Sequence, residues 1–436
     1  MLTYHSTPPS DQSPRWRTLS RRQRRALLRR VRIGREELAG LVRGSLLAAV
    51  WTVGLAWLAE QLEEEADRVC GAPRGKHSGQ RRGRRHGYEL GSVVLGGVRI
   101  PLLRPRVRSL DRKEELPLPL YELLQEEGSL EETVLVQLVA GVATRRYRAV
   151  MARALDLPEE LLAGVGKSSV SRRFVAQTAA RLAELFRRPL TERYVALFLD
   201  GLPLGEHLVI AAVGVTEEGV KRLLGVWEGA TENRAVCQAL LEDLVARGLS
   251  AERGLLVVID GSKALAQAVR AVLGERALIQ RCVWHKSRNV LEKLPEGLQP
   301  RVRRALLRAW GARTAWEAEQ ALQTLAEELA AAGYPEAAAS LREGLPETLT
   351  VIRLGLPPAL RRCLRTTNPI ESAFARHEQL AHRVRWWRNG RQALRWAALS
   401  LLQAEASFRT LPGAEALPQL TAALQRMLHP PAATAA

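Results

Sequence analysis

Short, largely apolar runs constrain the fold of this chain more than any other feature. They are Tyr194–Leu199, Leu208–Val213, Lys221–Trp227 and Leu255–Ile259, and a helical pattern from Asn233 to Val245 precedes the last of them. Continuous apolar runs bounded by turn residues are typical of strands that are buried on both faces of a sheet. The sequence therefore predicts a mixed α/β core of three sequential strands, a helix and a further strand.

Two of these predicted strands end on an Asp-Gly pair, at Asp200 and Asp260. A carboxylate just past a buried strand lies at the edge of the sheet, where ligands of α/β folds collect. Neighbouring strands would bring both carboxylates within reach of a common Mg²⁺ or Mn²⁺ ion, since these ions prefer oxygen ligands. The alternative is that each Asp-Gly pair only forms a turn, which is its commonest role.

A third acid, Glu371, follows the pair Asn368-Pro369. Thr366, Thr367 or Asn368 can cap a helix, and proline fits its first turn, so Glu371 is predicted at the N-terminal end of a helix that faces the sheet. The alternative is that Glu371 only stabilises that helix through its dipole.

The region from Gln280 to Arg353 is rich in Ala, Leu and Glu and has no strand-like run, which predicts an all-α insertion in the core. The predicted domains are a basic N-terminal region with a helix, a Gly/Arg loop and a β-hairpin (1–128), a helical helix-turn-helix-like domain (129–190), the first part of the core (191–279), the insertion (280–360), the helical C-terminal part of the core (361–410) and a tail (411–436).

The formal net charge of +19 favours a polyanionic partner, and nucleic acid is the default one. Basic residues concentrate at 15–32, predicted to be a helix over phosphates or a solvated tail, and at 71–87, predicted to be a loop or arm without regular structure. The dipeptide Gly96-Gly97 predicts a tight hairpin. The apolar run 44–59 is too short to span a membrane and is predicted to be a buried helix.

Three helices are predicted at 132–139, 147–155 and 167–186, with Ser168 or Ser169 as the cap of the third. Short helices followed by a helix led by Ser and Arg favour helix-turn-helix binding in the major groove, with plain helix packing as the alternative. The candidate DNA contacts are Lys167, Ser169, Ser171, Arg172 and Arg173 on this helix, Lys286 and Arg288 after the second Asp, and Arg385 and Arg388 after Glu371.

Taken together and in order, these motifs resemble those of the Mutator-type bacterial insertion-sequence transposases. The residues that carry the resemblance are Asp200-Gly201, Asp260-Gly261-Ser262-Lys263, Arg281 to Val290, Thr366 to Glu371 and Trp387 to Gly390. The resemblance implies an RNase H-like core with a D, D, E triad, interrupted by a helical insertion between the second Asp and the Glu. The triad then falls on Asp200, Asp260 and Glu371, at intervals of 60 (260−200) and 111 (371−260) residues.

Cys282 and His285 match the Cys-x-x-His signature of that family, and Trp284 lies between them. We expect these residues to orient the insertion near the active site, with Trp284 stacking on a base or sugar. Packing in the core is the alternative. A zinc site is a further possibility, although no second ligand pair with finger spacing stands out. Asn368 is a further supporting residue.

The predicted function is that of a DNA transposase that binds terminal inverted repeats. Such an enzyme cleaves strands and carries out strand transfer with the released 3′-OH as nucleophile, using two Mg²⁺ or Mn²⁺ ions per site. The expected partners are double-stranded DNA, both element ends and target, and at least a second copy of the chain, with no membrane. Four scattered cysteines favour a reducing compartment, so we expect a cytoplasmic, nucleoid-associated protein. The alternatives are a catalytically silent DNA-binding protein derived from a transposase, and an RNase H-like nuclease without strand transfer.

Overall fold

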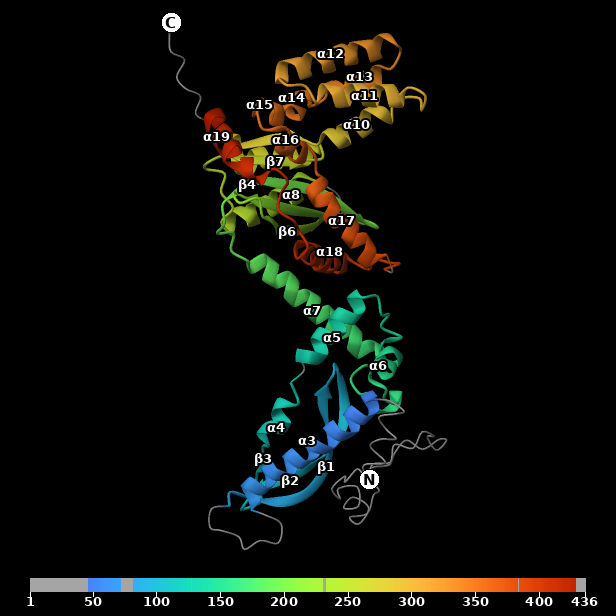
Figure 1. The fold of residues 1–436 in the computed structure, drawn as a ribbon, viewed down its shortest axis with the longest axis vertical. Helices are drawn as coiled ribbons and strands as arrows, with labels where there is room; N and C mark the ends of the chain where they lie inside the picture. The colour runs from blue at the N-terminus through green and yellow to red at the C-terminus, as the bar shows by residue number, and fades with distance from the viewer. Residues whose placement is uncertain (1–45, 72–80, 127, 230–232, 383, 429–436) are drawn as a thin grey trace. The chain divides into compact units, whose positions relative to one another are not determined.

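A computed structural model describes residues 46–71, 81–126, 128–229, 233–382 and 384–428 (Figure 1). The chain divides into two compact units, residues 1–177 and 178–436, and the boundary falls inside helix α7 (Lys167–Arg187). The predicted basic helix at 15–32 lies outside the described residues, as do residues 72–80 of the Gly/Arg loop. None of the helices in the described ranges has the length and apolar character that a membrane span requires.

The first unit is built on a long helix that packs against an antiparallel hairpin. Helix α3 (Leu46–Cys70) contacts β1 (Gly83–Leu95) and β2 (Val98–Ser109), and the short strand β3 (Glu115–Leu116) pairs with β2. The turn between β1 and β2 is Gly96-Gly97, with positive φ at both positions, which confirms the predicted hairpin.

Two predictions for this unit are wrong. Helix α3 is not buried all round, because Val50 and Trp57 are 58% and 57% exposed while Leu62 and other residues of α3 face the hairpin. Residues 83–87, predicted to lie in the loop, form the start of β1. Arg85 holds this part of β1 against α3, because its guanidinium forms ion pairs of 2.6 Å with both Glu63 and Asp67 of α3.

The three predicted helices of the first unit are confirmed as α5 (Gly128–Val139), α6 (Tyr147–Leu155) and α7, and the short α4 (Pro119–Leu123) and η2 (Glu159–Leu161) accompany them. Helix α7 begins at Lys167, so Ser168 and Ser169 lie within its first turn and the predicted cap is wrong. Residues 140–146 and 156–166 connect the helices, and both connections are longer than the turn of about 3–4 residues in a helix-turn-helix.

The described part of the second unit contains a mixed five-stranded sheet with the order β6-β5-β4-β7-β8. Its strands are β4 (Tyr194–Leu204), β5 (His207–Thr216), β6 (Lys221–Gly229), β7 (Leu255–Ile259) and β8 (Ala277–Arg281). β4, β5 and β6 are antiparallel, whereas β4, β7 and β8 are parallel. This confirms the predicted mixed α/β core.

The strand boundaries correct two predictions. Asp200 does not end its strand, because β4 continues to Leu204 and pairs with β5 as far as His207, and the turn lies at Gly205 with φ of +65°. The predicted insertion begins two residues too early, because Gln280 and Arg281 belong to β8.

Helices cover both faces of this sheet, and the strands alternate their side chains between them. Leu197 and Leu199 pack toward α8 (Arg234–Ala246) and α9 (Lys263–Leu273). Ala196 and Phe198 pack toward the C-terminal helices. The C-terminal helices are α16 (Pro358–Leu364), α17 (Asn368–Ala381), α18 (Gly390–Glu405) and α19 (Leu417–Leu428). Two short 3-10 helices, η3 (Gly274–Arg276) and η4 (Ala414–Ala416), lie in the connecting loops. The strands are therefore buried on both faces, as their continuous apolar sequence predicts.

A separate group of helices follows β8 and has its own core (Figure 1). The group consists of α10 (Val283–Leu291), α11 (Gln299–Ala309), α12 (Ala315–Ala331), α13 (Pro335–Arg342), α14 (Leu345–Thr348) and α15 (Thr350–Arg353). Trp310 is buried at its centre, and a capping box between Thr314 and Glu317 starts α12. The helical prediction for residues 283–353 is confirmed.

Candidate active site

Asp200 and Asp260 lie at the same end of two neighbouring parallel strands. The parallel pairing of β4 with β7 ends at Leu199 and Ile259, and each aspartate is the next residue in the chain: Asp200 lies within β4, and Asp260 directly follows β7. The carboxylate of Asp200 accepts a hydrogen bond of 2.9 Å from its neighbour Gly201 N–H, and that of Asp260 accepts one of 2.9 Å from Ser262 N–H. Backbone donors therefore orient both carboxylates at this edge of the sheet.

Glu371 lies in the first turn of α17, as predicted, and α17 packs on β4 and β5. Thr367 is at the N-cap position, Pro369 lies in the first turn, and Asn368 is exposed at the helix start. The Thr367 hydroxyl does not cap the helix but donates a hydrogen bond of 2.6 Å to Glu371 Oε1. The predicted capping side chain therefore positions the carboxylate instead.

The charges of the three carboxylates act on one another. Burial raises the pKa of Asp200 to about 7, with further contributions from the charges of Asp260 and Glu371, while His285 and the Gly201 N–H oppose the rise. Asp200 is only 6% exposed, so its negative charge is poorly solvated. Asp260 and Glu371 thus lie close enough to Asp200 for their charges to disfavour its ionisation.

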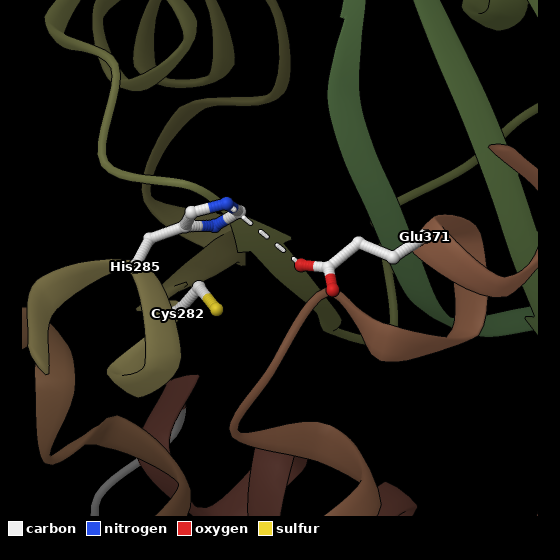
Figure 2. Close-up of side chains that lie close together, drawn as sticks. All are labelled: Cys282, His285 and Glu371. Atoms are coloured by element: carbon white, nitrogen blue, oxygen red, sulfur yellow. Dashed lines mark ion pairs between the residues drawn. The ribbon is translucent and has the colours of Figure 1, made fainter. Parts of the chain in front are cut away.

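Cys282, His285 and Glu371 point toward one another beside the acids (Figure 2). Burial alone would raise the pKa of the Cys282 thiol, but hydrogen bonds with His285 and Thr367 outweigh it and hold that pKa below its usual range. The hydrogen bond with Cys282 raises the pKa of His285 to about 9, and the charges of Asp200 and Glu371 add to the rise. His285 is thus a cation at neutral pH, placed among anions.

Residues after Cys282 have different environments. Trp284 is 53% exposed, which excludes the core-packing alternative for this side chain and leaves its ring open to solvent. Lys286 is 1% exposed, and its ammonium donates hydrogen bonds of 2.6 Å to the carbonyls of Ser340 and Glu343. Its use as a phosphate contact is therefore a wrong prediction, because α13 buries it. Arg288 is exposed on α10.

The candidate DNA contacts on α7 lie in its first two turns. Lys167, Ser171 and Arg172 are exposed and Ser169 is half-buried. Arg173 is half-buried and its guanidinium donates a hydrogen bond of 2.8 Å to the Gly164 carbonyl. Lys167, Ser171 and Arg172 are therefore the side chains of this set that are most accessible to DNA.

The segment after α17 presents one tryptophan to solvent and half-buries the other. Arg385, Trp386 and Arg388 are exposed, and the Trp386 side chain is 73% exposed. Trp387 packs against the core and stacks on His377 with ring centroids 6.2 Å apart. Residues 384–389 are not helical, and α18 begins only after Asn389, whose side chain caps it.

Acidification should destabilise the second unit through His377. This residue is 2% exposed, its Nδ1 lies 2.6 Å from Ser400 Oγ, and its Nε2 has no hydrogen-bond partner among the described residues. Burial lowers its pKa to about 4. Because the unfolded chain, with a pKa of about 6.5, binds the proton more readily, stability is full above pH 6.5 and is lost as the pH falls toward 4, by roughly 3 kcal/mol.

The measurement is the free energy of unfolding by urea at pH 7 and pH 4.5. The substitution His377→Gln, which does not titrate, should lose about 2 kcal/mol less than the wild type between these pH values. His382→Gln, an exposed position on the same segment, is the matched control and should behave as the wild type. Equal acid losses in all three proteins would contradict the prediction.

Two residues of this site escape reasoning from the sequence. From the sequence, Thr367 is predicted only as a possible helix cap. Its spacing of four residues from Glu371 is the signal that places both side chains on one face of a helix. Arg281 carries no individual signal, yet it is buried and its guanidinium donates hydrogen bonds to the carbonyls of Gly261 and Glu343. Only the fold brings Arg281 to the loop that follows Asp260.

Comparison with known proteins gives consistent results. The family model described as "Transposase, Mutator family" matches residues 43–409. The chain is 34% identical over 215 residues to the transposase for insertion sequence element IST2 of Acidithiobacillus ferrooxidans, which covers 48% of this chain and 71% of the relative.

Two further relatives are similar at the same level. The chain is 31% identical over 220 residues to the transposase for IS6120 of Mycolicibacterium smegmatis, and 31% identical over 264 residues to that for IS1081 of Mycobacterium tuberculosis. These alignments cover 49% and 57% of this chain, and span 66% and 60% of the relatives' own lengths. Because the family model covers most of the chain, including all three acids, this chain belongs to the Mutator family of transposases.

Proposed function

We propose that this chain is a DNA transposase with an RNase H-like catalytic core, in which Asp200, Asp260 and Glu371 form a DDE active site. The observation that carries the proposal is that both aspartates directly follow the last paired residues of the parallel strands β4 and β7, with Glu371 near enough to raise the pKa of Asp200. The helical group between Asp260 and Glu371 also matches the insertion that the family resemblance implies. Family membership supports a DNA-cutting and DNA-joining enzyme.

The residues of the site fit divalent metal ions. Three carboxylates supply the hard oxygen ligands that Mg²⁺ and Mn²⁺ prefer, and the poorly solvated charge of Asp200 needs a cation nearby. Asp200, Asp260 and Glu371 would hold two ions. When bound, such ions supply Lewis-acid activation of an attacking oxygen and neutralise charge on the leaving 3′ oxygen.

The side chains around the carboxylates orient them for this role. Gly201 and Ser262 N–H groups hold the two aspartates, and the Thr367 hydroxyl holds Glu371. His285, a cation beside the acids, offsets part of their repulsion before DNA arrives. With water as the nucleophile the site would cleave a strand at the element end, and with the released 3′-OH as the nucleophile it would join that end to a target.

DNA is the proposed partner, both as terminal inverted repeats and as target. The exposed cations of α7 would contact one stretch of duplex and Arg288, Arg385 and Arg388 would contact phosphates near the active site. The exposed rings of Trp284 and Trp386 suit stacking on a base or sugar. Holding two ends together implies a homodimer or larger assembly on DNA, and the proposed location is the bacterial nucleoid in the cytoplasm.

A two-step DNA assay tests the proposed function. The substrate is DNA from both flanks of the coding sequence, which should contain matching inverted repeats. With Mg²⁺, the full chain should cleave at the repeat ends, and a pre-cleaved end with a 3′-OH should join to a supercoiled plasmid. Cleavage without joining would indicate the nuclease alternative, and end binding without either reaction would indicate the silent DNA-binding alternative.

The proposed contact of Arg172 with DNA predicts a change in salt dependence. Arg172→Ala should weaken binding of end-containing duplex and lower the slope of log affinity against log salt by about 1, because one phosphate contact is lost. Arg426→Ala, an exposed arginine on α19 outside the proposed contacts, is the control and should leave the slope unchanged. The measurement is fluorescence anisotropy over a range of salt concentrations. An unchanged slope for Arg172→Ala would remove this residue from the interface.

A further inference from the structure

Glu371 contributes to two different ligand environments. Its charge acts, together with that of Asp260, on the pKa of Asp200. Cys282 and His285 lie beside it, and Glu371 Oε1 lies 3.8 Å from His285 Nε2. The Thr367 hydroxyl, which donates to Glu371 Oε1, holds the carboxylate beside them. Figure 2 shows the three side chains converging from α10 and α17.

These side chains form a compact set of metal-ligand atoms. Among the residues that the structure describes, Cys282, His285 and Glu371 are the one group of three or more Cys, His and acidic residues whose ligand atoms all lie within 4.8 Å of one another. Around a tetrahedral zinc ion, ligand atoms lie about 3.5 Å apart. The set therefore needs shifts of about 1 Å to close on an ion, which rotation of the Glu371 and His285 side chains can supply.

Thr367 marks the point on which the three side chains converge. Its Oγ1 lies 3.5 Å from Cys282 Sγ, 3.4 Å from His285 Nδ1 and 2.6 Å from Glu371 Oε1. The helix geometry also suits chelation, because Cys282 and His285 are three residues apart at the start of α10 and lie on one face. An ion bound here would replace protons on these ligands.

The chemistry of the set selects zinc rather than magnesium. A thiolate and an imidazole are soft or intermediate ligands that favour Zn²⁺ over Mg²⁺, and one carboxylate completes three protein ligands. Cys282 is fully buried, whereas the His285 and Glu371 side chains are 18% and 31% exposed. The set is therefore closed behind the sulfur and open to solvent at the carboxylate, which leaves room for a fourth ligand such as water.

We propose that Cys282, His285 and Glu371 form a zinc site that competes with the magnesium site for Glu371, so that zinc inhibits strand cleavage. The zinc site stands on the geometry alone, whereas the inhibition rests on the proposed function. A zinc ion held by Glu371 Oε1 between Cys282 and His285 would withdraw that oxygen from the acidic set and repel a Mg²⁺ ion beside it. Zinc occupancy would thus switch the catalytic site off without touching either aspartate.

Metal titration of the full chain tests the zinc site. After chelator treatment and dialysis, the wild type should bind one Zn²⁺ at this site, and Co²⁺ in its place should give a thiolate-to-metal charge-transfer band in the near ultraviolet. Cys282→Ser should lose the band and bind Zn²⁺ about 100-fold more weakly or worse, since loss of an outer-shell partner alone costs about 10- to 100-fold. Glu371→Gln should weaken zinc binding but keep the band.

The controls separate loss of a ligand from loss of the fold. Cys363→Ser removes a half-buried thiol outside the set and should keep both the band and the affinity. His285→Gln is a second ligand variant, and all variants are compared by near-ultraviolet circular dichroism. A cobalt spectrum without a thiolate band, or wild-type zinc affinity in well-folded Cys282→Ser, would overturn the site.

A second measurement tests the competition. At constant Mg²⁺, wild-type cleavage should fall in parallel with zinc occupancy and recover on chelation. Zinc binding without loss of cleavage would overturn the competition for Glu371. Absence of cleavage in zinc-free Mg²⁺ buffer would count against the proposed function instead, and the cobalt band and zinc affinity would still decide the site.

Discussion

Replacing Asp200 by Asn should lower metal-dependent strand cleavage by about 10³-fold or more and, at the same time, stabilise the metal-free chain. The loss of activity follows from removing one of the three carboxylates of the proposed active site, since single losses from catalytic groups that act as a unit are about as costly as removing the whole unit. Asn keeps the shape of the side chain, so the backbone hydrogen bond from Gly201 can be retained.

The gain in stability follows from the raised pKa of Asp200, about 7 in the folded chain against an ordinary value of 3.8. A carboxyl group whose folded pKa is raised favours folding fully only below pH 3.8, and this contribution is lost as the pH rises through 7. At pH 8 the ionised group should cost up to about 4 kcal/mol, at roughly 1.4 kcal/mol for each pKa unit. Asp200→Asn removes that cost.

Urea unfolding in chelator at pH 5 and pH 8, with cleavage assayed in Mg²⁺, measures both effects. Between these pH values the wild type should lose stability relative to Asp200→Asn. Glu206→Gln, an exposed acid in the β4–β5 turn, is the matched control and should resemble the wild type in both assays. Undiminished cleavage by Asp200→Asn would refute the place of Asp200 in the active site. A lower free energy of unfolding for Asp200→Asn than for the wild type at pH 8 would refute the cost of the buried charge.

Arg281→Ala should cost about 3 kcal/mol of stability and slow cleavage by about 10- to 100-fold. The Arg281 side chain is 8% exposed, and its Nη1 donates a hydrogen bond of 2.9 Å to the Glu343 carbonyl while its Nη2 donates to that of Gly261. Truncation removes the Arg281 donor from the Gly261 carbonyl, whereas the Glu343 carbonyl keeps its hydrogen bond from Lys286. Because Gly261 follows Asp260 directly, the loop that presents the carboxylate loses its anchor, and small displacements of catalytic groups are costly.

Arg270→Ala is the matched control for this substitution. Arg270 is 58% exposed on α9 and pairs with Glu347, so its loss should cost less than about 1 kcal/mol and leave cleavage unchanged. Urea unfolding measures the stability, and cleavage is measured at a temperature where both variants are folded. If Arg281→Ala loses stability but keeps both the wild-type rate and the wild-type Mg²⁺ requirement, Arg281 has no positioning role.

The environment of Lys286 illustrates why composition alone misassigns side chains. In the sequence Lys286 lies beside Arg288 and is indistinguishable from a phosphate contact. In the fold it points from α10 toward α13, where two backbone carbonyls accept its hydrogen bonds, while Arg288 points to solvent. Burial lowers the pKa of Lys286 to about 8, because the ammonium has lost its water. Which residue of a helix is buried depends on what packs against it, and α13 lies over 40 residues away in sequence.

The sequence by itself determined the core strands β4, β5, β6 and β7, the two Asp-Gly positions and the helix that carries Glu371, but it missed β8. Those signals are local: continuous apolar runs, a proline in a first helical turn and a pair of glycines in a hairpin act through the backbone of adjacent residues. Local patterns also predicted that Asp260 directly follows its strand, which the end of β7 at Ile259 confirms.

Only the tertiary structure decided what surrounds those acids. β5 pairs beyond Asp200 and so keeps it within a strand, Arg281 reaches the Gly261 loop, and Thr367 holds Glu371 beside Cys282 and His285. Each of these contacts joins segments that are distant in the chain, and no local pattern encodes the direction in which a side chain meets a remote partner. The electrostatics of the site follow from those contacts, because burial and neighbouring charges, not residue type alone, set the pKa of Asp200.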